Sequence, residues 1–142
     1  MRAGTENVAG IVGMAVALQD HMEHLEQETE YLKALSGRLI DQLKSKGLDF
    51  SMNGSHNRIP GSLSLSFKDA DGEMLLHRLD LMGTAVATGS ACDSKDTVLS
   101  HVIRAIEVPQ GYAHGTIRIT LGLDNTSEQM DKIAHQISTV LR

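Results

Sequence analysis

The first third of the chain carries apolar side chains at helical spacing over one long run, from Val8 to Leu43. The members of the run are Val8, Ile11, Val12, Ala15, Leu18, Met22, Leu25, Leu32, Leu35, Leu39, Ile40 and Leu43. This spacing predicts one long helix, or two helices in line with a break at Ser36-Gly37. Lys44, Lys46 and Gly47 then supply the basic, glycine-terminated end that helix C-termini prefer.

A coiled coil is the alternative for this helix, because Leu25, Leu32 and Leu39 lie seven residues apart. The small residues upstream, among them Gly10 and Gly13, instead favour packing on a globular body. Packing on a globular body is therefore the first interpretation, and the coiled coil is the second.

The most apolar stretch, Val8 to Leu18, is too short to cross a bilayer and contains two glycines. A signal peptide is a second interpretation, because Arg2 precedes the stretch and Ala15-Val16-Ala17 resembles a cleavage site. Glu6 offsets that positive start, however, and the helical pattern continues past the supposed site. One cysteine cannot form an internal disulfide, which is typical of a reducing compartment. We therefore expect a cytoplasmic protein without a membrane span.

Composition argues against nucleic acid as a partner. The chain has 142 residues, enough for one domain with its own core, and a formal net charge of -5. Its basic residues are scattered among acidic ones, and only 3% of its residues are aromatic. Neither a basic patch for phosphates nor a stacking platform for bases is therefore expected.

Beyond Gly47 the apolar period changes from helical to alternating, as in Leu63, Leu65 and Phe67 against Ser62, Ser64 and Ser66. The patterns predict strands around 50–52, 63–67, 84–88 and 117–121, and helices over 71–83, over 98–106 up to Pro109, and from 126–128 onward. This order predicts an α+β fold, with a long N-terminal helix followed by a small sheet that has helices packed on one face.

Cys92 lies in the run Ala87-Thr88-Gly89-Ser90-Ala91-Cys92-Asp93-Ser94-Lys95-Asp96, between an expected strand and an expected helix. A lone cysteine is commonly an inert buried thiol. A glycine-rich, polar setting favours instead an exposed thiol on a loop with little packing to hold it. Lys95 or the following helix N-terminus can raise its thiolate fraction. We therefore interpret Cys92 as a nucleophile.

Arg118 lies in Gly115-Thr116-Ile117-Arg118-Ile119-Thr120-Leu121-Gly122, where strand alternation places it opposite Ile117 and Ile119. A surface arginine is one interpretation, and a guanidinium that binds a carboxylate with two hydrogen bonds is the other. His114 precedes this strand, where it can reach a site or simply lie in a solvated turn.

Thr5 precedes the long helix, in Arg2-Ala3-Gly4-Thr5-Glu6-Asn7. A hydroxyl and free backbone N–H groups at a helix N-terminus suit a phosphate, although an ordinary helix cap uses the same residues. His21, His24 and Glu28 fall near one another on a helical face and raise the possibility of a metal site. The acidic and histidine residues around them are more simply a solvated face, so no metal is predicted.

Three segments taken together resemble the cysteine desulfurases of iron–sulfur assembly, which are class-V aminotransferase-like enzymes dependent on pyridoxal phosphate. They are Arg2-Ala3-Gly4-Thr5-Glu6-Asn7-Val8-Ala9-Gly10, Ala87-Thr88-Gly89-Ser90-Ala91-Cys92 and His114-Gly115-Thr116-Ile117-Arg118-Ile119-Thr120-Leu121-Gly122. The resemblance implies the small domain of a fold-type I enzyme. It also implies that the complete enzyme takes sulfur from L-cysteine, leaving L-alanine and an enzyme persulfide.

By this resemblance Cys92 is the thiolate that attacks the substrate sulfur, Arg118 binds the substrate carboxylate, and Thr5 contacts the cofactor phosphate from the partner subunit of a homodimer. Asp93 stands where the family usually has a small residue, and its carboxylate tends to raise the thiol pKa. The Schiff-base lysine, the histidine over the cofactor ring and the acid at its pyridine nitrogen belong to a large domain that would precede Met1.

The chain is thus expected to be the C-terminal portion of the enzyme, with residues 1–47 linking to that cofactor domain and residues 48–142 forming the small domain. The main functional hypothesis is sulfur transfer to an acceptor or scaffold protein for iron–sulfur cluster or thio-cofactor synthesis, in a homo-oligomer. The alternatives are a catalytically inactive dimerisation or docking module and a stand-alone persulfide carrier. On its own, the chain is expected to be inactive.

Overall fold

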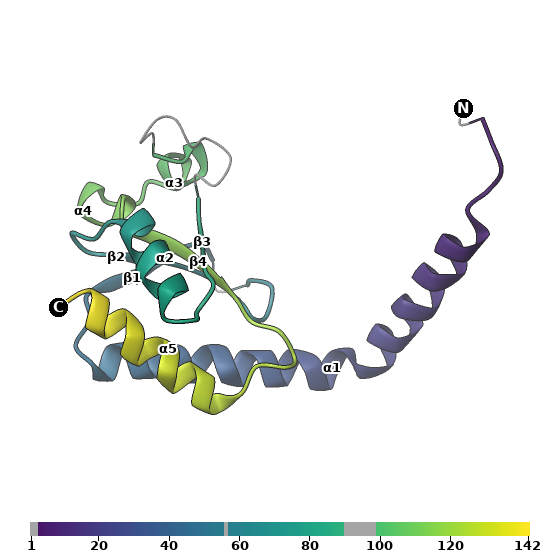
Figure 1. Ribbon diagram of the computed structural model, residues 1–142, viewed down its shortest axis with the longest axis horizontal. Helices are drawn as coiled ribbons and strands as arrows, with labels where there is room; N and C mark the ends of the chain where they lie inside the picture. The colour runs from purple at the N-terminus through teal and green to yellow at the C-terminus, as the bar shows by residue number, and fades with distance from the viewer. Residues whose placement is uncertain (1–2, 56, 90–98) are drawn as a thin grey trace.

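A computed structural model describes residues 3–55, 57–89 and 99–142 (Figure 1). The elements are α1 (Val8–Ser45), β1 (Phe50–Met52), β2 (Ser62–Phe67), α2 (Gly72–Leu81), β3 (Ala87–Thr88), α3 (His101–Ala105), α4 (Gln110–Ala113), β4 (Thr116–Thr120) and α5 (Ser127–Val140). Within these described residues no helix is both long enough and apolar enough to span a membrane.

α1 is one continuous helix, and the predicted break at Ser36-Gly37 is wrong. A glycine inside a helix costs about 1 kcal/mol relative to alanine. Leu35 and Leu39, on either side of Gly37, are both buried in the core, so tertiary packing holds the backbone helical here. The predicted C-terminus is confirmed, because Lys46 caps the helix and Gly47 follows with φ +70.

The four strands form one antiparallel sheet in the order β1-β2-β4-β3. The predicted alternation is confirmed from Ser62 to Leu65, where Leu63 and Leu65 are buried and Ser62 and Ser64 only partly so, but Ser66 is buried as well as Phe67. β3 is shorter than expected. Thr84 does not join it, because its backbone N–H donates to the Leu79 carbonyl and its side chain to Gln136.

The core lies between the apolar face of this sheet and the helices α1, α2 and α5, as predicted for helices on one face. α5 begins at a capping box in which Thr126 and Gln129 satisfy each other's backbone N–H groups. In Figure 1 α5 runs alongside the C-terminal half of α1. Arg38 and Asp131 join the two helices by a double hydrogen bond of 2.9 and 2.6 Å, which lowers the pKa of the Asp131 carboxyl.

α4 was not expected from the sequence. The sequence predicts that Pro109 ends the preceding helix, and in the structure Pro109 is the N-cap of a new short one. The backbone N–H groups of Tyr112 and Ala113 both donate to the Pro109 carbonyl. A proline has its φ fixed near helical values, so it can begin a helical turn as well as end one.

Gln136 is a buried polar side chain that ties α5 to the connection between α2 and β3. Its carbonyl accepts from the Thr84 hydroxyl at 2.6 Å, and its amide donates to the Met82 carbonyl at 2.8 Å. We expect Gln136→Ala to lower the free energy of unfolding by about 2–3 kcal/mol, because it leaves buried polar groups without partners and opens a small cavity. Urea denaturation followed by circular dichroism measures the change.

Gln27→Ala is the matched control, since Gln27 lies on the exposed part of α1. Its free energy of unfolding should stay within about 0.5 kcal/mol of the native value. Equal effects of the two substitutions would show that the Gln136 hydrogen bonds do not stabilise the fold.

The N-terminal half of α1 projects away from the rest of the molecule in Figure 1. Its apolar side chains are between 49% and 70% exposed: Val8, Ile11, Val12, Met14, Val16, Leu18, Met22 and Leu25. The three leucines spaced seven residues apart therefore have different environments. Leu39 is buried in the core and Leu32 packs against it, whereas Leu25 is exposed. A surface this apolar is typical of an interface.

Candidate functional site

Arg118 lies in the middle of β4, on the face of the sheet opposite the core. Its directly opposite neighbours are Ser64 on β2 and Ala87 on β3, both small. The other strand residues on this face are hydroxyl-bearing or small, so Arg118 is the charge that the described strands present there. It is exposed, and no ion pair or hydrogen bond joins its side chain to another described residue. Its guanidinium is therefore available to an anion.

A chain of hydrogen bonds runs across the same face of the sheet. The Asn53 amide donates to the Ser64 hydroxyl at 3.1 Å and to the Ser66 hydroxyl at 2.7 Å. Ser66 and Thr116 lie 2.7 Å apart, and the Thr116 hydroxyl donates to the Ala113 carbonyl at 2.8 Å. Ser66 and Thr116 are buried, whereas Ser64 is only partly buried. The network thus begins in the interior and ends beside Arg118.

The Gly115 backbone packs directly against the end of β2. An added Cβ would lie 2.2 Å from the Phe67 carbonyl oxygen and 2.9 Å from the Ala70 Cβ. The Phe67 N–H donates to the Gly115 carbonyl at 3.0 Å, and the Gly72 N–H donates to the His114 carbonyl at 2.8 Å. The His114 side chain is exposed at the end of α4. These contacts fix where β4 begins and hence the position of Arg118.

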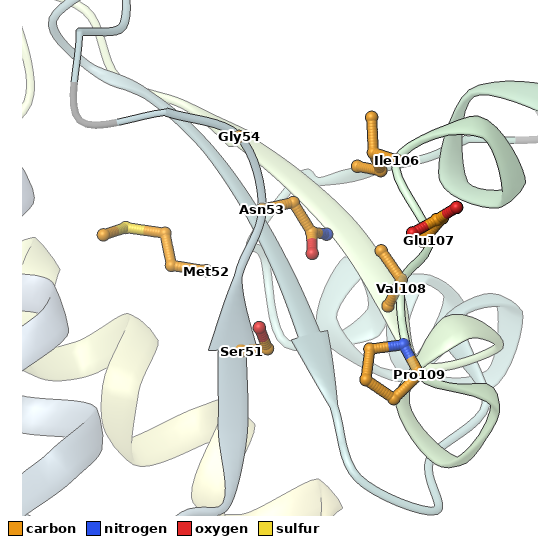
Figure 2. A pocket seen from close by; sticks show the side chains of 8 residues that line it. All are labelled: Ser51, Met52, Asn53, Gly54, Ile106, Glu107, Val108 and Pro109. Atoms are coloured by element: carbon orange, nitrogen blue, oxygen red, sulfur yellow. The ribbon is translucent and has the colours of Figure 1, made fainter.

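A shallow hollow of about 310 Å³ lies on the sheet side of the α3–α4 connection. In Figure 2, Asn53 projects from the end of β1 toward Ile106 and Val108, while Met52 points the opposite way, toward the helices. The lining residues are Ser51, Met52, Asn53, Gly54, Ile106, Glu107, Val108 and Pro109. None of the predicted site residues lines it. Asn53 links the hollow to the hydroxyl network.

Tyr112, on α4, donates its hydroxyl to the Asp49 carboxylate at 2.8 Å, and this hydrogen bond raises the pKa of Tyr112. The Asp49 carboxylate also pairs with Lys68 at 3.5 Å. These side chains join α4 to the loop before β1. They hold the helix that precedes the Arg118 strand.

Thr5 is exposed and lies just before α1, but it does not cap the helix. Asn7 is the N-cap, and its side chain accepts from the Gly10 N–H at 3.1 Å. The helix separates Thr5 from the sheet, and at about 1.5 Å per residue its 38 residues measure roughly 57 Å along the helix axis. Figure 1 shows the N-terminus far from β4. Within one chain, Thr5 and Arg118 are therefore not brought together.

Cys92 lies outside the described residues, as do Asp93 and Lys95. On its N-terminal side, the Thr88 hydroxyl donates to the Glu73 carboxylate at 2.8 Å. A Cβ on Gly89 would lie 3.2 Å from the Ser100 Cβ, so the backbone at Gly89 is close to Ser100. Gly89 and Ser100, which are described residues on either side of 90–98, therefore lie close together.

The histidines of α1 contact neighbours on the same helix. His21 lies 3.4 Å from the Glu28 carboxylate, and His24 contacts the Asp20 carbonyl at 2.9 Å, which raises the pKa of His24. Over the described ranges, no three His, Cys, Asp or Glu side chains are grouped to hold a metal ion.

Pyridoxal phosphate, which the resemblance implies, requires a lysine amine inside an enclosed site. The lysines of the described part of the chain lie at its surface, four of them on or at the ends of α1 and α5: Lys33, Lys44, Lys46, Lys68 and Lys132. None of these lines the hollow. The described residues therefore do not fit a complete cofactor site by themselves.

Comparison with known proteins identifies the family. A sequence model of the class-V aminotransferases matches residues 1–133. Cysteine desulfurase IscS of Dictyoglomus turgidum is 44% identical over 131 residues, covering 92% of this chain and 33% of that protein. Cysteine desulfurase NifS of Azotobacter vinelandii is 33% identical over 141 residues, covering 99% and 35%. The chain thus spans about a third of the length of these relatives.

Solved structures show the same fold. A NifS-like protein superposes with a TM-score of 0.80 at 31% identity, covering 99% of this chain and 35% of its own. A second NifS-like protein, from Rickettsia africae, has a TM-score of 0.82 at 23% identity and supports the fold alone. The chain belongs to the class-V aminotransferase family, as a homologue of the C-terminal third of the cysteine desulfurases.

Proposed function

We propose that this chain is the C-terminal part of a cysteine desulfurase. In the complete enzyme, the sulfur of L-cysteine becomes a persulfide on Cys92, L-alanine is released, and the persulfide sulfur passes to an acceptor for iron–sulfur cluster or thio-cofactor synthesis. The observation that carries the proposal is Arg118, an exposed guanidinium without a partner among the described residues, held at the centre of a sheet in a chain of this family.

In this proposal Arg118 binds the substrate carboxylate through two parallel hydrogen bonds, which fix the orientation of the amino acid. The Cys92 thiolate attacks the substrate sulfur. A sulfur–sulfur bond forms and the carbon–sulfur bond breaks, and its electron pair stays with carbon, which a proton then converts to the methyl group of alanine. The step needs no external oxidant or reductant. Bound pyridoxal phosphate would supply the electron sink that activates the substrate.

The described lysines do not form a cofactor site, so in this proposal a separate domain of the complete enzyme binds the cofactor. We propose that residues 1–47 link to that domain and that residues 48–142 form the small domain. The exposed apolar half of α1 supports the proposal, since a helix that is apolar on most sides is normally buried. Thr5 and Arg118 lie on separate elements, before α1 and within β4, and this separation supports a homodimer in which Thr5 serves the cofactor phosphate of the partner subunit.

The proposal is tested by supplying the cofactor domain. The chain is mixed with the N-terminal two-thirds of a related cysteine desulfurase and pyridoxal phosphate, and alanine formation from L-cysteine is measured. Arg118→Lys should lower kcat/KM by about 10- to 100-fold, because an ammonium cannot replace the two-pronged hydrogen bonding to a carboxylate. Its folding should barely change, because the side chain is exposed.

Arg104→Lys is the matched control, because Arg104 is an exposed arginine on α3 and not on a strand of the sheet. It should leave kcat/KM unchanged. Equal activity of the Arg118→Lys protein would reduce Arg118 to a surface residue. A mixture that assembles but forms no alanine would instead favour the alternative of a catalytically inactive docking module, which the exposed apolar half of α1 also supports.

A further inference from the structure

The hydroxyl network beside Arg118 leaves one hydrogen without an acceptor. Thr116 gives its hydroxyl hydrogen to the Ala113 carbonyl, so Ser66 must donate in the 2.7 Å contact between Ser66 and Thr116. Both Ser64 and Ser66 therefore accept from the Asn53 amide, whose two hydrogens are then both used. The Ser64 hydroxyl hydrogen has no acceptor among the described residues.

The orientation of the Asn53 amide follows from the same assignment of hydrogen-bond donors and acceptors. If its oxygen faced the serines, Ser66 would donate to that oxygen, and the Ser66 to Thr116 contact would contain no hydrogen. The amide nitrogen facing the serines is the arrangement that satisfies all four contacts. The Ser64 hydroxyl therefore accepts a hydrogen bond from Asn53 on the β1 side. The hydrogen of the Ser64 hydroxyl must then point in another direction.

Ser64 is directly opposite Arg118 across the β2–β4 pair, on the same face of the sheet. Side chains in such a pair have Cβ atoms about 4.5–5.5 Å apart. On the other side, Ala87 offers neither bulk nor a hydrogen-bonding side chain. Of the two residues directly opposite Arg118, Ser64 on β2 is therefore the one that can donate a further hydrogen bond to an anion bound there. A carboxylate suits this set, because its two oxygens accept about four hydrogen bonds in all.

We propose that Ser64 is a second donor to the carboxylate bound by Arg118, and that Asn53 is a positioning residue that orients the Ser64 hydroxyl. This inference rests on the proposed role of Arg118 and deepens it. The site then recognises a carboxylate with a two-pronged guanidinium on one strand and a hydroxyl on the next. Ser62, one step along the same face of β2, pairs with Thr120 rather than Arg118 and takes no part.

The test uses the 142-residue chain, with acetate as the carboxylate probe and acetamide as its neutral counterpart. Nuclear magnetic resonance follows the Arg118 side-chain N–H signals and the Ser64 backbone amide during each titration. Acetate should shift both sets of signals and acetamide neither. Ser64→Ala should raise the acetate Kd about three- to tenfold, as expected for one hydrogen bond to a charged group at a partly exposed site. Ser62→Ala should leave it unchanged.

Asn53→Ala should also weaken acetate binding, but it should add nothing in a Ser64→Ala background, because it acts through the Ser64 hydroxyl. A purely structural effect of Asn53 would persist in that background and would overturn its positioning role. If Arg118→Lys abolishes acetate binding while Ser64→Ala behaves like Ser62→Ala, the inference fails and the role of Arg118 survives. If acetate shifts neither signal in the native chain, both are overturned.

Discussion

Gly115→Ala is expected to lower the free energy of unfolding by about 4 kcal/mol or more, a large share of the roughly 5–15 kcal/mol that holds a typical domain folded. The added methyl group would meet the Phe67 carbonyl oxygen at 2.2 Å, a backbone atom that cannot rotate away. Relieving the contact requires β4 to move from β2, which breaks the hydrogen bond from the Phe67 N–H to the Gly115 carbonyl. Both groups lie in the buried interior, so each would be left unsatisfied. Chemical denaturation and the dispersion of amide resonances measure the loss.

Gly37→Ala makes the same chemical change where there is room for it. Apart from its chain neighbours and the nearby backbone of its own helix, no described atom lies within 4 Å of the Cβ that it would add, and Gly37 lies inside a continuous helix. This variant should be more stable than the native chain by about 0.5–1 kcal/mol. The two alanines are therefore expected to act in opposite directions. A Gly115→Ala protein as stable as the native chain would show that the close approach at β2 is not required.

Cys92→Ser is expected to abolish persulfide formation completely in the reconstituted enzyme. A serine hydroxyl is far less acidic than a thiol, and it cannot retain the transferred sulfur as a persulfide. Cys92 is the only cysteine in the chain, so no second thiol can substitute for it. Mass spectrometry after incubation with L-cysteine should show the native chain heavier by one sulfur atom and the variant unchanged.

Alkylation of the native chain tests the reactivity of the same thiol. The sequence predicts that Cys92 is accessible, so iodoacetamide should add one label without denaturant, and that label is necessarily on Cys92. Labelling that occurs only after denaturation would indicate a buried thiol and would remove the main physical support for sulfur transfer. Persulfide on the Cys92→Ser protein would place the sulfur on another group and contradict the assignment.

Elements with a strong apolar period were predictable from the sequence, and those set by tertiary contacts were not. β2, β4 and α5 follow directly from alternation or helical spacing. The continuity of α1 through Gly37 depends on burial of Leu35 and Leu39, which no local pattern reports. The short β3 likewise depends on Thr84 bonding to Gln136, 52 residues away.

In the candidate site too, some features were predictable from the sequence and others depended on tertiary contacts. Alternation alone placed Arg118 on the face away from the core, and the structure confirms it. The role of Ser64 required the register between β2 and β4 and the direction of each hydrogen bond, neither of which the serine pattern contains. An asparagine directly after a strand, beside a serine-rich strand, was the available signal. The exposure of Cys92 stays a prediction, because it lies outside the described residues.

Because α1 is one continuous helix, the number of residues in it determines how its two halves are oriented relative to each other. Its C-terminal half is fixed in the core through Leu35, Leu39 and Leu43, and its apolar N-terminal half extends from the same unbroken backbone. Each residue between the two halves adds about 1.5 Å of length and about 100° of rotation. The number of residues in the helix therefore sets the direction in which the outer apolar surface faces relative to Arg118. A domain bound to the outer apolar surface would therefore take its orientation from α1. Inserting or deleting a residue in α1 would rotate that domain about the helix axis relative to Arg118.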